Sequence, residues 1–183
     1  MTKSSSVKAD FVMPILVLTL ICLIASAVLA FTNNVTEPII KETEAAIAEA
    51  ARIEVLPEAD GFTQLNVDLP DGSFVTEVYK ANNDVGYVFM ITCNGYGGKG
   101  TMKLICSMDP DGRIIAAKTL AHAETAGMGS KTADDAFRLQ FTGKDSSLEG
   151  VDTITGATFS SNYYIEGIRS AFEAYELVKG GEA

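Results

Sequence analysis

The sequence predicts an α+β domain that follows a single transmembrane helix. Three observations carry this prediction: an uncharged apolar run near the N-terminus, a series of short strand-like segments in the middle of the chain, and helical periodicity near its end. Successive strands followed by helices are typical of an α+β fold with an antiparallel sheet and flanking helices. The 183 residues, less one membrane segment, leave roughly 150 residues for one domain with a hydrophobic core.

The first expected element is the membrane segment. From Phe11 to Phe31 the chain carries no charge, and this run is long enough to cross a bilayer as a helix. Lys3 and Lys8 precede it and the residues that follow are acidic, so the positive-inside rule predicts a cytoplasmic N-terminus (1–10) and a domain on the outer face. A cleaved signal peptide is the alternative, because Ala25-Ser26-Ala27 resembles a cleavage site. The length of the run favours an uncleaved, single-pass anchor.

A connecting helix is expected over residues 32–56, ahead of a domain over residues 57–183. Glu37 to Val55 shows partial helical periodicity, and Pro57 predicts its end. The stretch from Gly61 to Asp71 predicts a loop. Segments separated by turn-forming residues predict three or four strands, at Phe74–Lys80, Gly86–Cys93, Gly100–Met108 and Arg113–Leu120.

Two helices are expected after the strands. Ala133 to Phe141 predicts a short helix with both of its phenylalanines on one side. The final helix is expected from about Ser161 to Val178, where large side chains recur at three- and four-residue spacing. We interpret this apolar stripe as core, with Tyr164, Ile168, Phe172 and Tyr175 as its members.

Composition excludes several classes of function. The net charge of −10 and the lack of a basic patch argue against nucleic-acid binding. A single histidine excludes a His-rich metal site, and Cys22, Cys93 and Cys106 lack the Cys-x-x-Cys spacing of zinc or iron–sulfur ligands, so no metal is expected. A hairpin turning near Gly97 would not place Cys93 opposite Cys106, so we expect two free, buried thiols.

The run from Asp152 to Ser161 holds several hydroxyls and a Gly-Ala pair where a loop is expected to become a helix. Small residues let the backbone approach a phosphate closely, and the first N–H groups of a helix are free to donate to an anion. A capped helix start, with Ser160 or Ser161 as the N-cap, is the alternative interpretation.

The residues Asp152-Thr153-Ile154-Thr155-Gly156-Ala157-Thr158 resemble the flavinylation signature Asp-x-x-Ser/Thr-Gly-Ala-Thr. This signature belongs to the FMN-binding domain shared by the G subunit of Rnf complexes and the C subunit of sodium-pumping NADH:quinone reductases. In that family the last Thr carries FMN through a phosphoester bond, which implies Thr158 here. The resemblance also implies cofactor contacts at Thr155, Gly156, Ala157 and Ser160. Asp152 is expected either to be read by a flavin transferase or to be an ordinary turn or cap residue.

A second segment, from Ala121 to Gly129, resembles the family loop His-x-Glu-Thr-Pro-Gly-Leu-Gly, which lies against the flavin. It departs from that pattern at Ala126, where Pro is usual, and at Met128, where Leu is usual. The resemblance implies flavin contacts at Glu124, Thr125, Gly127 and Met128. Lys131 could offset flavin or phosphate charge, or could be a solvated surface lysine. His122 is expected to be a hydrogen-bonded structural residue.

The resemblance covers most of the chain, from the Pro57 region to the final helix. It implies an electron-transfer subunit with covalent FMN in a membrane-bound Rnf complex, which is not catalytic alone. Such a complex couples ferredoxin:NAD oxidoreduction to sodium or proton translocation across a bacterial cell membrane. The implied partners are the other membrane subunits, a flavin transferase during maturation, and ferredoxin and NAD through the complex. The alternatives are a C-type subunit of a quinone-reducing sodium pump, which the short chain disfavours, and a non-redox anchored extracytoplasmic binding domain.

Overall fold

The computed structural model describes residues 4–181, with side chains from residue 11 onward. Lys3 lies outside the described residues and Lys8 outside the described side chains, so the charge pattern that predicts the orientation rests on the sequence alone. The described chain forms two compact units, which divide between Ala46 and Ile47. The boundaries expected at residues 10, 31 and 56 stay predictions.

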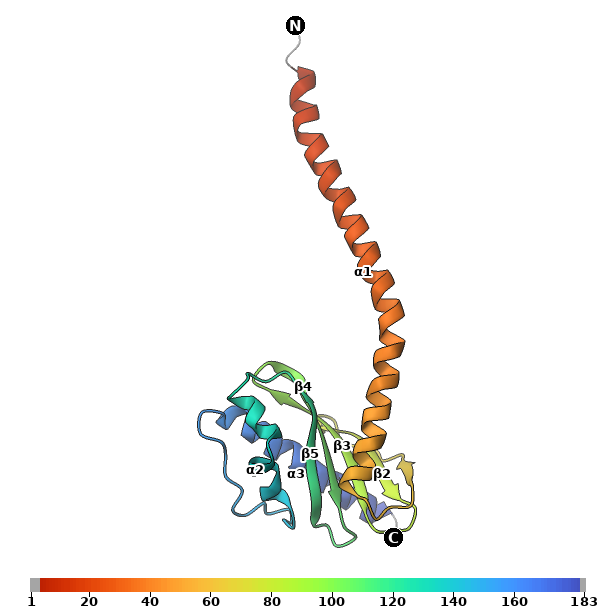
Figure 1. Ribbon diagram of the computed structural model, residues 1–183, viewed down its shortest axis with the longest axis vertical. Coiled ribbons are helices and arrows are strands. Elements are labelled where there is room, and N and C mark those ends of the chain that lie inside the picture. Colours follow the sequence, from red (N-terminus) through yellow and green to blue (C-terminus); the bar gives the residue numbers. More distant parts are fainter. Residues whose placement is uncertain (1–3, 182–183) are drawn as a thin grey trace. The chain divides into compact units, whose positions relative to one another are not determined.

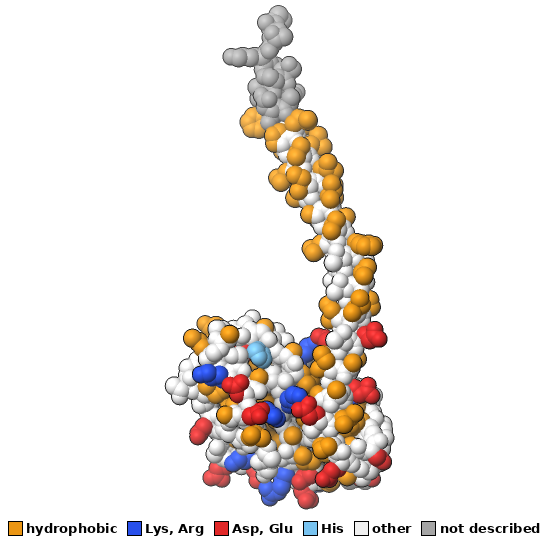
Figure 2. Space-filling model, in the orientation of Figure 1, with side chains coloured by type: hydrophobic (Ala, Val, Ile, Leu, Met, Phe, Trp, Pro, Cys, Tyr) orange, Lys and Arg blue, Asp and Glu red, His pale blue; other side chains and the backbone are white. Residues whose placement is uncertain are grey.

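The N-terminal unit is part of one long helix, α1 (Ser4–Val55), where separate membrane and connecting helices were expected. Pro14 and Pro38 lie within this stretch, and the helix continues through both. Of the described residues, only those of α1 form a helix with the length and composition to cross a membrane. Figure 2 shows hydrophobic and uncharged side chains along the upper described part of α1, whereas charged side chains lie on its lower part and on the folded unit.

The folded unit is built on a five-stranded antiparallel sheet in the order β1-β2-β3-β4-β5 (Figure 1). Its strands are β1 (Phe62–Leu65), β2 (Val75–Ala81), β3 (Tyr87–Gly95), β4 (Gly98–Met108) and β5 (Ile114–His122). The four strands expected from the sequence are present, with ends shifted by two residues at most. The loop expected from Gly61 to Asp71 is wrong in part, because Phe62–Leu65 pairs with the end of β2, with Phe62 opposite Ala81.

One face of the sheet forms the main core with the final helix, α3 (Thr158–Gly181). Alternate residues of β3 and β4 point to this helix, as period-two strands require. Tyr164 and Ile168 are fully buried here, which confirms that the apolar stripe of the last helix is core. The side chains of this face that meet α3 include Phe89, Ile91, Cys93, Met102, Leu104 and Cys106.

The opposite face is covered in part by the last turns of α1. Ala51 and Val55 pack with the buried Val88 and Ile105 of the sheet. The fully buried Ser107 hydroxyl donates to the Val55 carbonyl at 2.6 Å and accepts the Ala116 N–H at 3.2 Å. The first of these bonds satisfies a carbonyl that the helix end leaves without an intrahelical partner. The end of α1 is therefore fixed to the centre of the sheet.

Three short helical pieces replace the single helix expected from Ala133 to Phe141. They are a 3₁₀ helix, η1 (Gly129–Ala133), then α2 (Asp135–Arg138) and a second 3₁₀ helix, η2 (Leu139–Phe141). Asp134 is extended (φ −73°, ψ 147°) and breaks the expected helix. Phe137 and Phe141 nevertheless share one side, because both rings pack on Tyr164, at centroid distances of 5.2 and 5.1 Å.

The two cysteines of the sheet are free and buried, as expected. Cys93 lies opposite Met102 and Cys106 lies opposite Phe89, so the strand register keeps the thiols apart. Burial raises the pKa of the Cys93 thiol to about 12 and raises the pKa of Cys106 as well. Both thiols are therefore protonated at physiological pH.

Candidate functional site

The loop before α3 ends in a tight turn. The Ala157 N–H donates to the Ile154 carbonyl at 2.9 Å, and Gly156 at the third position of the turn has φ +83°. A positive φ favours glycine, and the space beside Gly156 is open, because a Cβ there would meet no atom within 4 Å. Thr158 follows as the first residue of α3 and is exposed.

The helix begins earlier than expected, so Ser160 and Ser161 lie inside it and the alternative interpretation, in which one of them is the N-cap, is wrong. Ser161 instead ties the loop to the helix. Its hydroxyl accepts the Ile154 N–H at 3.1 Å and donates to the Ala157 carbonyl at 2.9 Å. Thr158, Phe159 and Ser160 form the first turn, where backbone N–H groups have no intrahelical acceptor. An exposed hydroxyl therefore stands beside free N–H donors at the positive end of a helix dipole.

The segment Glu124–Gly129 forms a second turn of the same kind. The Met128 N–H donates to the Thr125 carbonyl at 3.1 Å, and Gly127 at the third position has φ +77°. The Gly127 N–H donates to the Ser130 hydroxyl at 2.9 Å. A Cβ on Gly127 would also meet no atom within 4 Å. The turn therefore closes without proline at position 126.

Glu124 joins the two turns. Its Oε2 accepts the Ser160 hydroxyl at 2.6 Å, and its Oε1 accepts the Tyr96 N–H at 2.8 Å. Gly95 and Gly129 are buried on either side, and a Cβ on either glycine would overlap a carboxylate oxygen. The carboxylate thus links the β3–β4 hairpin, its own loop and the first turn of α3.

This arrangement gives Glu124 and Ser160 a structural role that the sequence does not reveal. Both were expected to contact a cofactor. Ser160 is 2% exposed and donates its hydroxyl to Glu124, while both oxygens of Glu124 accept hydrogen bonds from the protein. The sequence hints at this role only through Gly95 and Gly129, the two glycines that pack against the Glu124 carboxylate.

The other predicted residues are placed around this centre. Thr125, Lys131 and Thr155 are exposed, whereas Ala157 is buried at the base of α3. The His122 Nδ1 accepts the Glu124 N–H at 3.3 Å, which agrees with a structural histidine.

Asp152 presents an exposed side chain from a loop that Gln140 holds in place. The Asp152 N–H donates to the Gln140 side-chain oxygen at 2.9 Å. The structure therefore places Asp152 on the surface, outside the hydrogen bonds that join the two turns.

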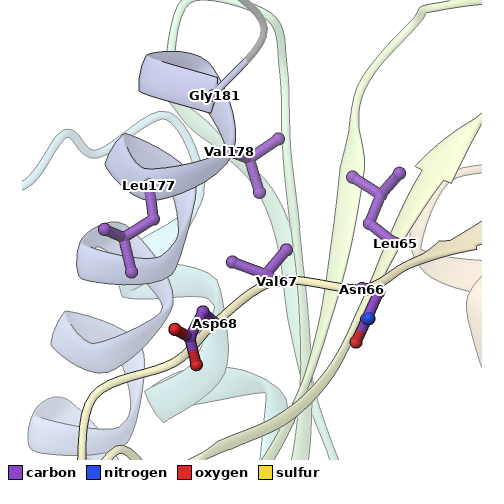
Figure 3. Close-up of a pocket in the computed structure, with 7 residues that line it drawn as sticks. All are labelled: Leu65, Asn66, Val67, Asp68, Leu177, Val178 and Gly181. Carbon is purple, nitrogen blue, oxygen red and sulfur yellow. The ribbon is translucent and has the colours of Figure 1, made fainter.

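A pocket of ≈ 390 Å³ lies at the other end of α3 (Figure 3). The segment from Leu65 to Asp68 lines one side, and Leu177, Val178 and Gly181 line the other. Thr158 and Gly181 are the two ends of a 24-residue helix, so this pocket is remote from both turns. Its lining residues include one carboxylate and no basic group to hold an anion.

Comparisons with known proteins identify the domain. A sequence model of the FMN-binding domain matches residues 95–173, which include β4, the residues that join it to β3, and both turns. The G subunit of the ion-translocating oxidoreductase complex of Methanosarcina acetivorans is 32% identical over 91% of this chain and 95% of its own length. The chain belongs to this G-subunit family. The resemblance inferred from the two motifs is thereby confirmed.

Other members of the G-subunit family match nearly as much of the chain. The G subunit of the proton-translocating ferredoxin:NAD(+) oxidoreductase complex of Clostridium ljungdahlii is 27% identical over 90% of this chain and 91% of its own. The Na(+)-translocating counterpart from Acetobacterium woodii is 27% identical over 88% and 89%. Together with the apolar helix α1, this membership makes the chain a membrane protein with an FMN-binding domain of α+β fold.

The residues present fit FMN. A phosphate suits the first turn of α3, where Thr158 is exposed beside free N–H donors. The open space beside Gly127 and Gly156 leaves room for a large planar group against the two turns. Thr158, Gly156 and the Glu124–Met128 turn are the parts of this chain that would hold the cofactor.

Proposed function

We propose that this chain is an electron-carrying subunit of an ion-translocating membrane oxidoreductase complex, and that Thr158 carries FMN through a phosphoester bond. The exposure of Thr158 is the observation that carries the proposal. Of the hydroxyl-bearing residues at the start of α3, Ser160 and Ser161 are buried and donate to protein groups, whereas Thr158 is exposed.

The attachment requires a second enzyme. A threonine hydroxyl is a weak nucleophile near neutral pH and needs activation. The Glu124 carboxylate accepts the Tyr96 N–H and the Ser160 hydroxyl, and among the described residues it has no hydrogen bond to Thr158 that would activate this hydroxyl. A flavin transferase that uses FAD would form the bond between Thr158 Oγ and phosphorus, break the pyrophosphate bond, and release AMP with the hydroxyl proton. The exposed Asp152 is the residue such an enzyme could recognise.

Once bound, FMN supplies one-electron redox chemistry, and the protein supplies attachment and orientation. The neighbouring turns would hold the ring close to Thr158, while α1 anchors the domain at the membrane. The names of two relatives include ferredoxin and NAD but differ in the ion, one naming protons and the other sodium. We propose ferredoxin:NAD oxidoreduction as the overall reaction, coupled to one of these two ions.

The attachment site is tested by co-expression with a flavin transferase. The wild-type chain should show flavin fluorescence in a denaturing gel, and Thr158→Ala should abolish it. Thr158→Ser keeps a hydroxyl, and Thr155→Ala removes the other exposed hydroxyl of the Gly-Ala turn, so both should retain the signal. A Thr158→Ala protein that stays fluorescent would show that another residue carries the flavin.

The proposed orientation has its own test. With a cytoplasmic N-terminus and an outer domain, protease added to intact cells should digest the domain and spare the extreme N-terminus. Protection of the whole domain until lysis would contradict this orientation. A mature chain that starts near Val28 would contradict the uncleaved anchor.

The complex that contains the chain can be identified by its substrates. The membrane complex purified through this chain should reduce NAD with reduced ferredoxin. Activity with a quinone instead of ferredoxin would place the chain in a quinone-reducing sodium pump.

A further inference from the structure

The folded unit exposes few large hydrophobic side chains. Among the described residues after Leu56, the large hydrophobic residues that are exposed are Tyr96, Met128, Leu139, Phe159 and Leu177. Three of these five lie on the segments that Glu124 joins: the hairpin, the Glu124–Gly129 turn and the first turn of α3. Apolar side chains clustered at one place on a soluble surface indicate a surface that is covered in the working protein.

Two of these side chains are in contact. The ring of Phe159 meets the ring of Tyr96 edge to face at a centroid distance of 6.3 Å, and meets the half-buried Tyr163 at 5.0 Å. We call Tyr96, Phe159 and Tyr163 the aromatic wall. Tyr96 and Phe159 are 73% and 57% exposed, so their mutual contact covers only a part of each ring.

The position of the aromatic wall is fixed by the protein. Glu124 accepts the backbone N–H of Tyr96 and the hydroxyl of Ser160, which follows Phe159 directly. Phe159 and Tyr163 are one turn apart on α3. Glu124 therefore fixes the aromatic wall relative to the first turn of α3, where Thr158 directly precedes Phe159.

We propose that the aromatic wall is the surface on which the isoalloxazine ring of the flavin rests. This inference depends on the proposed attachment at Thr158. Attachment fixes only the phosphate end, and a tethered planar ring will cover apolar surface that lies within reach. Aromatic rings bind such a ring through offset or edge-to-face contacts. The occupant is the flavin, because the wall begins at the residue next to Thr158.

The aromatic wall predicts a spectroscopic signature. A tyrosine in contact with an excited flavin quenches its fluorescence by donating an electron, whereas phenylalanine is too hard to oxidise to do so. Native flavinylated protein should therefore be several-fold dimmer than the same flavin on a short peptide released by proteolysis. Its fluorescence anisotropy should report a ring that turns with the whole protein.

Full-length flavinylated variants test the inference, with all signals normalised to the flavin fluorescence of the denatured protein. Tyr96→Phe should raise native fluorescence while anisotropy stays high, because the ring keeps its support and loses one of the two tyrosine quenchers of the wall. Phe159→Ala should lower the anisotropy, and Phe159→Leu should restore part of it. Leu139→Ala, an equally exposed apolar residue on η2, is the control and should change neither signal.

Failure of the inference and failure of the proposed function look different. Absence of flavin fluorescence after denaturation would mean that the flavin is not attached, which contradicts the proposed function. If the flavin is attached but native brightness and anisotropy equal those of the released peptide, the wall does not hold the ring. Unchanged signals in both Tyr96→Phe and Phe159→Ala would overturn the inference as well, and would leave the wall as a surface for a partner protein.

Discussion

Removing the Glu124 carboxylate tests whether one residue holds the site together. Glu124→Ala deletes the acceptor of the Tyr96 N–H and of the Ser160 hydroxyl, at 2.8 and 2.6 Å. Hydrogen bonds to charged groups contribute about 1.5–3 kcal/mol each to stability. Glu124 is only partly buried, so the lower value applies and the two bonds together contribute roughly 3 kcal/mol. In a domain of this size the loss corresponds to a Tm lower by roughly 10 °C.

The matched variant Glu124→Gln separates shape from charge. Its amide oxygen can accept the Tyr96 N–H, and its NH₂ group can donate to the Ser160 hydroxyl oxygen. Both hydrogen bonds survive without the charge, so the expected loss is about 1 kcal/mol. Glu124→Ala combined with Ser160→Ala should cost less than the sum of the two single changes, by about 1–2 kcal/mol, because the side chains share one bond.

Thermal unfolding of the full chain in mild detergent, followed by circular dichroism, measures these differences. Glu173→Ala is the control, because Glu173 is an exposed residue of α3 and its change should stay within about 0.5 kcal/mol. A Glu124→Ala protein as stable as the control would refute the structural role of the carboxylate. A Glu124→Gln protein as unstable as Glu124→Ala would refute the hydrogen-bond geometry.

Three further experiments test other parts of the structure. Gly127→Val places a β-branched residue at φ +77°, so we expect the free energy of unfolding to fall by about 2 kcal/mol and the flavin absorption band to shift. The control Gly180→Ala, on α3, should leave stability unchanged or raise it. A Gly127→Val protein as stable as this control would contradict the positive φ of the turn. Ser107→Ala leaves the Val55 carbonyl without its donor and should cost about 2 kcal/mol in the same melts, and no loss would mean that water replaces the hydroxyl. Burial raises the pKa of Cys93 to about 12 and also raises the pKa of Cys106. A thiol reagent at mildly alkaline pH should therefore label neither of these two cysteines in the native protein and both of them after unfolding. Labelling of Cys93 or Cys106 in the native protein would show that the core opens.

Patterns within single segments predicted most of the fold. The central strands were visible because turn-forming residues bound them, and the last helix because its large residues recur at helical spacing. β1 was missed because its four residues carry only two partly buried side chains, so its position depends on backbone pairing with β2. The start of α3 was misplaced by three residues because its first turn has no apolar periodicity.

The candidate site was predictable in its parts but not in its connections. The two motifs indicated two loops, and each proved to be a turn with glycine at a positive φ. The contact between them joins Glu124 to Ser160, which are 36 residues apart, and no local pattern reports such a pair. The contact between the rings of Tyr96 and Phe159 was not predictable for the same reason, since only the folded chain brings the hairpin beside α3.

Mass spectrometry of the chain isolated from its native membrane tests the central claim most directly. Our account predicts an intact mass that exceeds the sequence mass by one FMN less one water, with the added mass on the peptide that contains Thr158. Fragmentation should place it on the Thr158 hydroxyl, the one exposed at the first residue of α3. An unmodified chain isolated from a membrane whose complex is active, or a flavin on any other residue, would contradict the account.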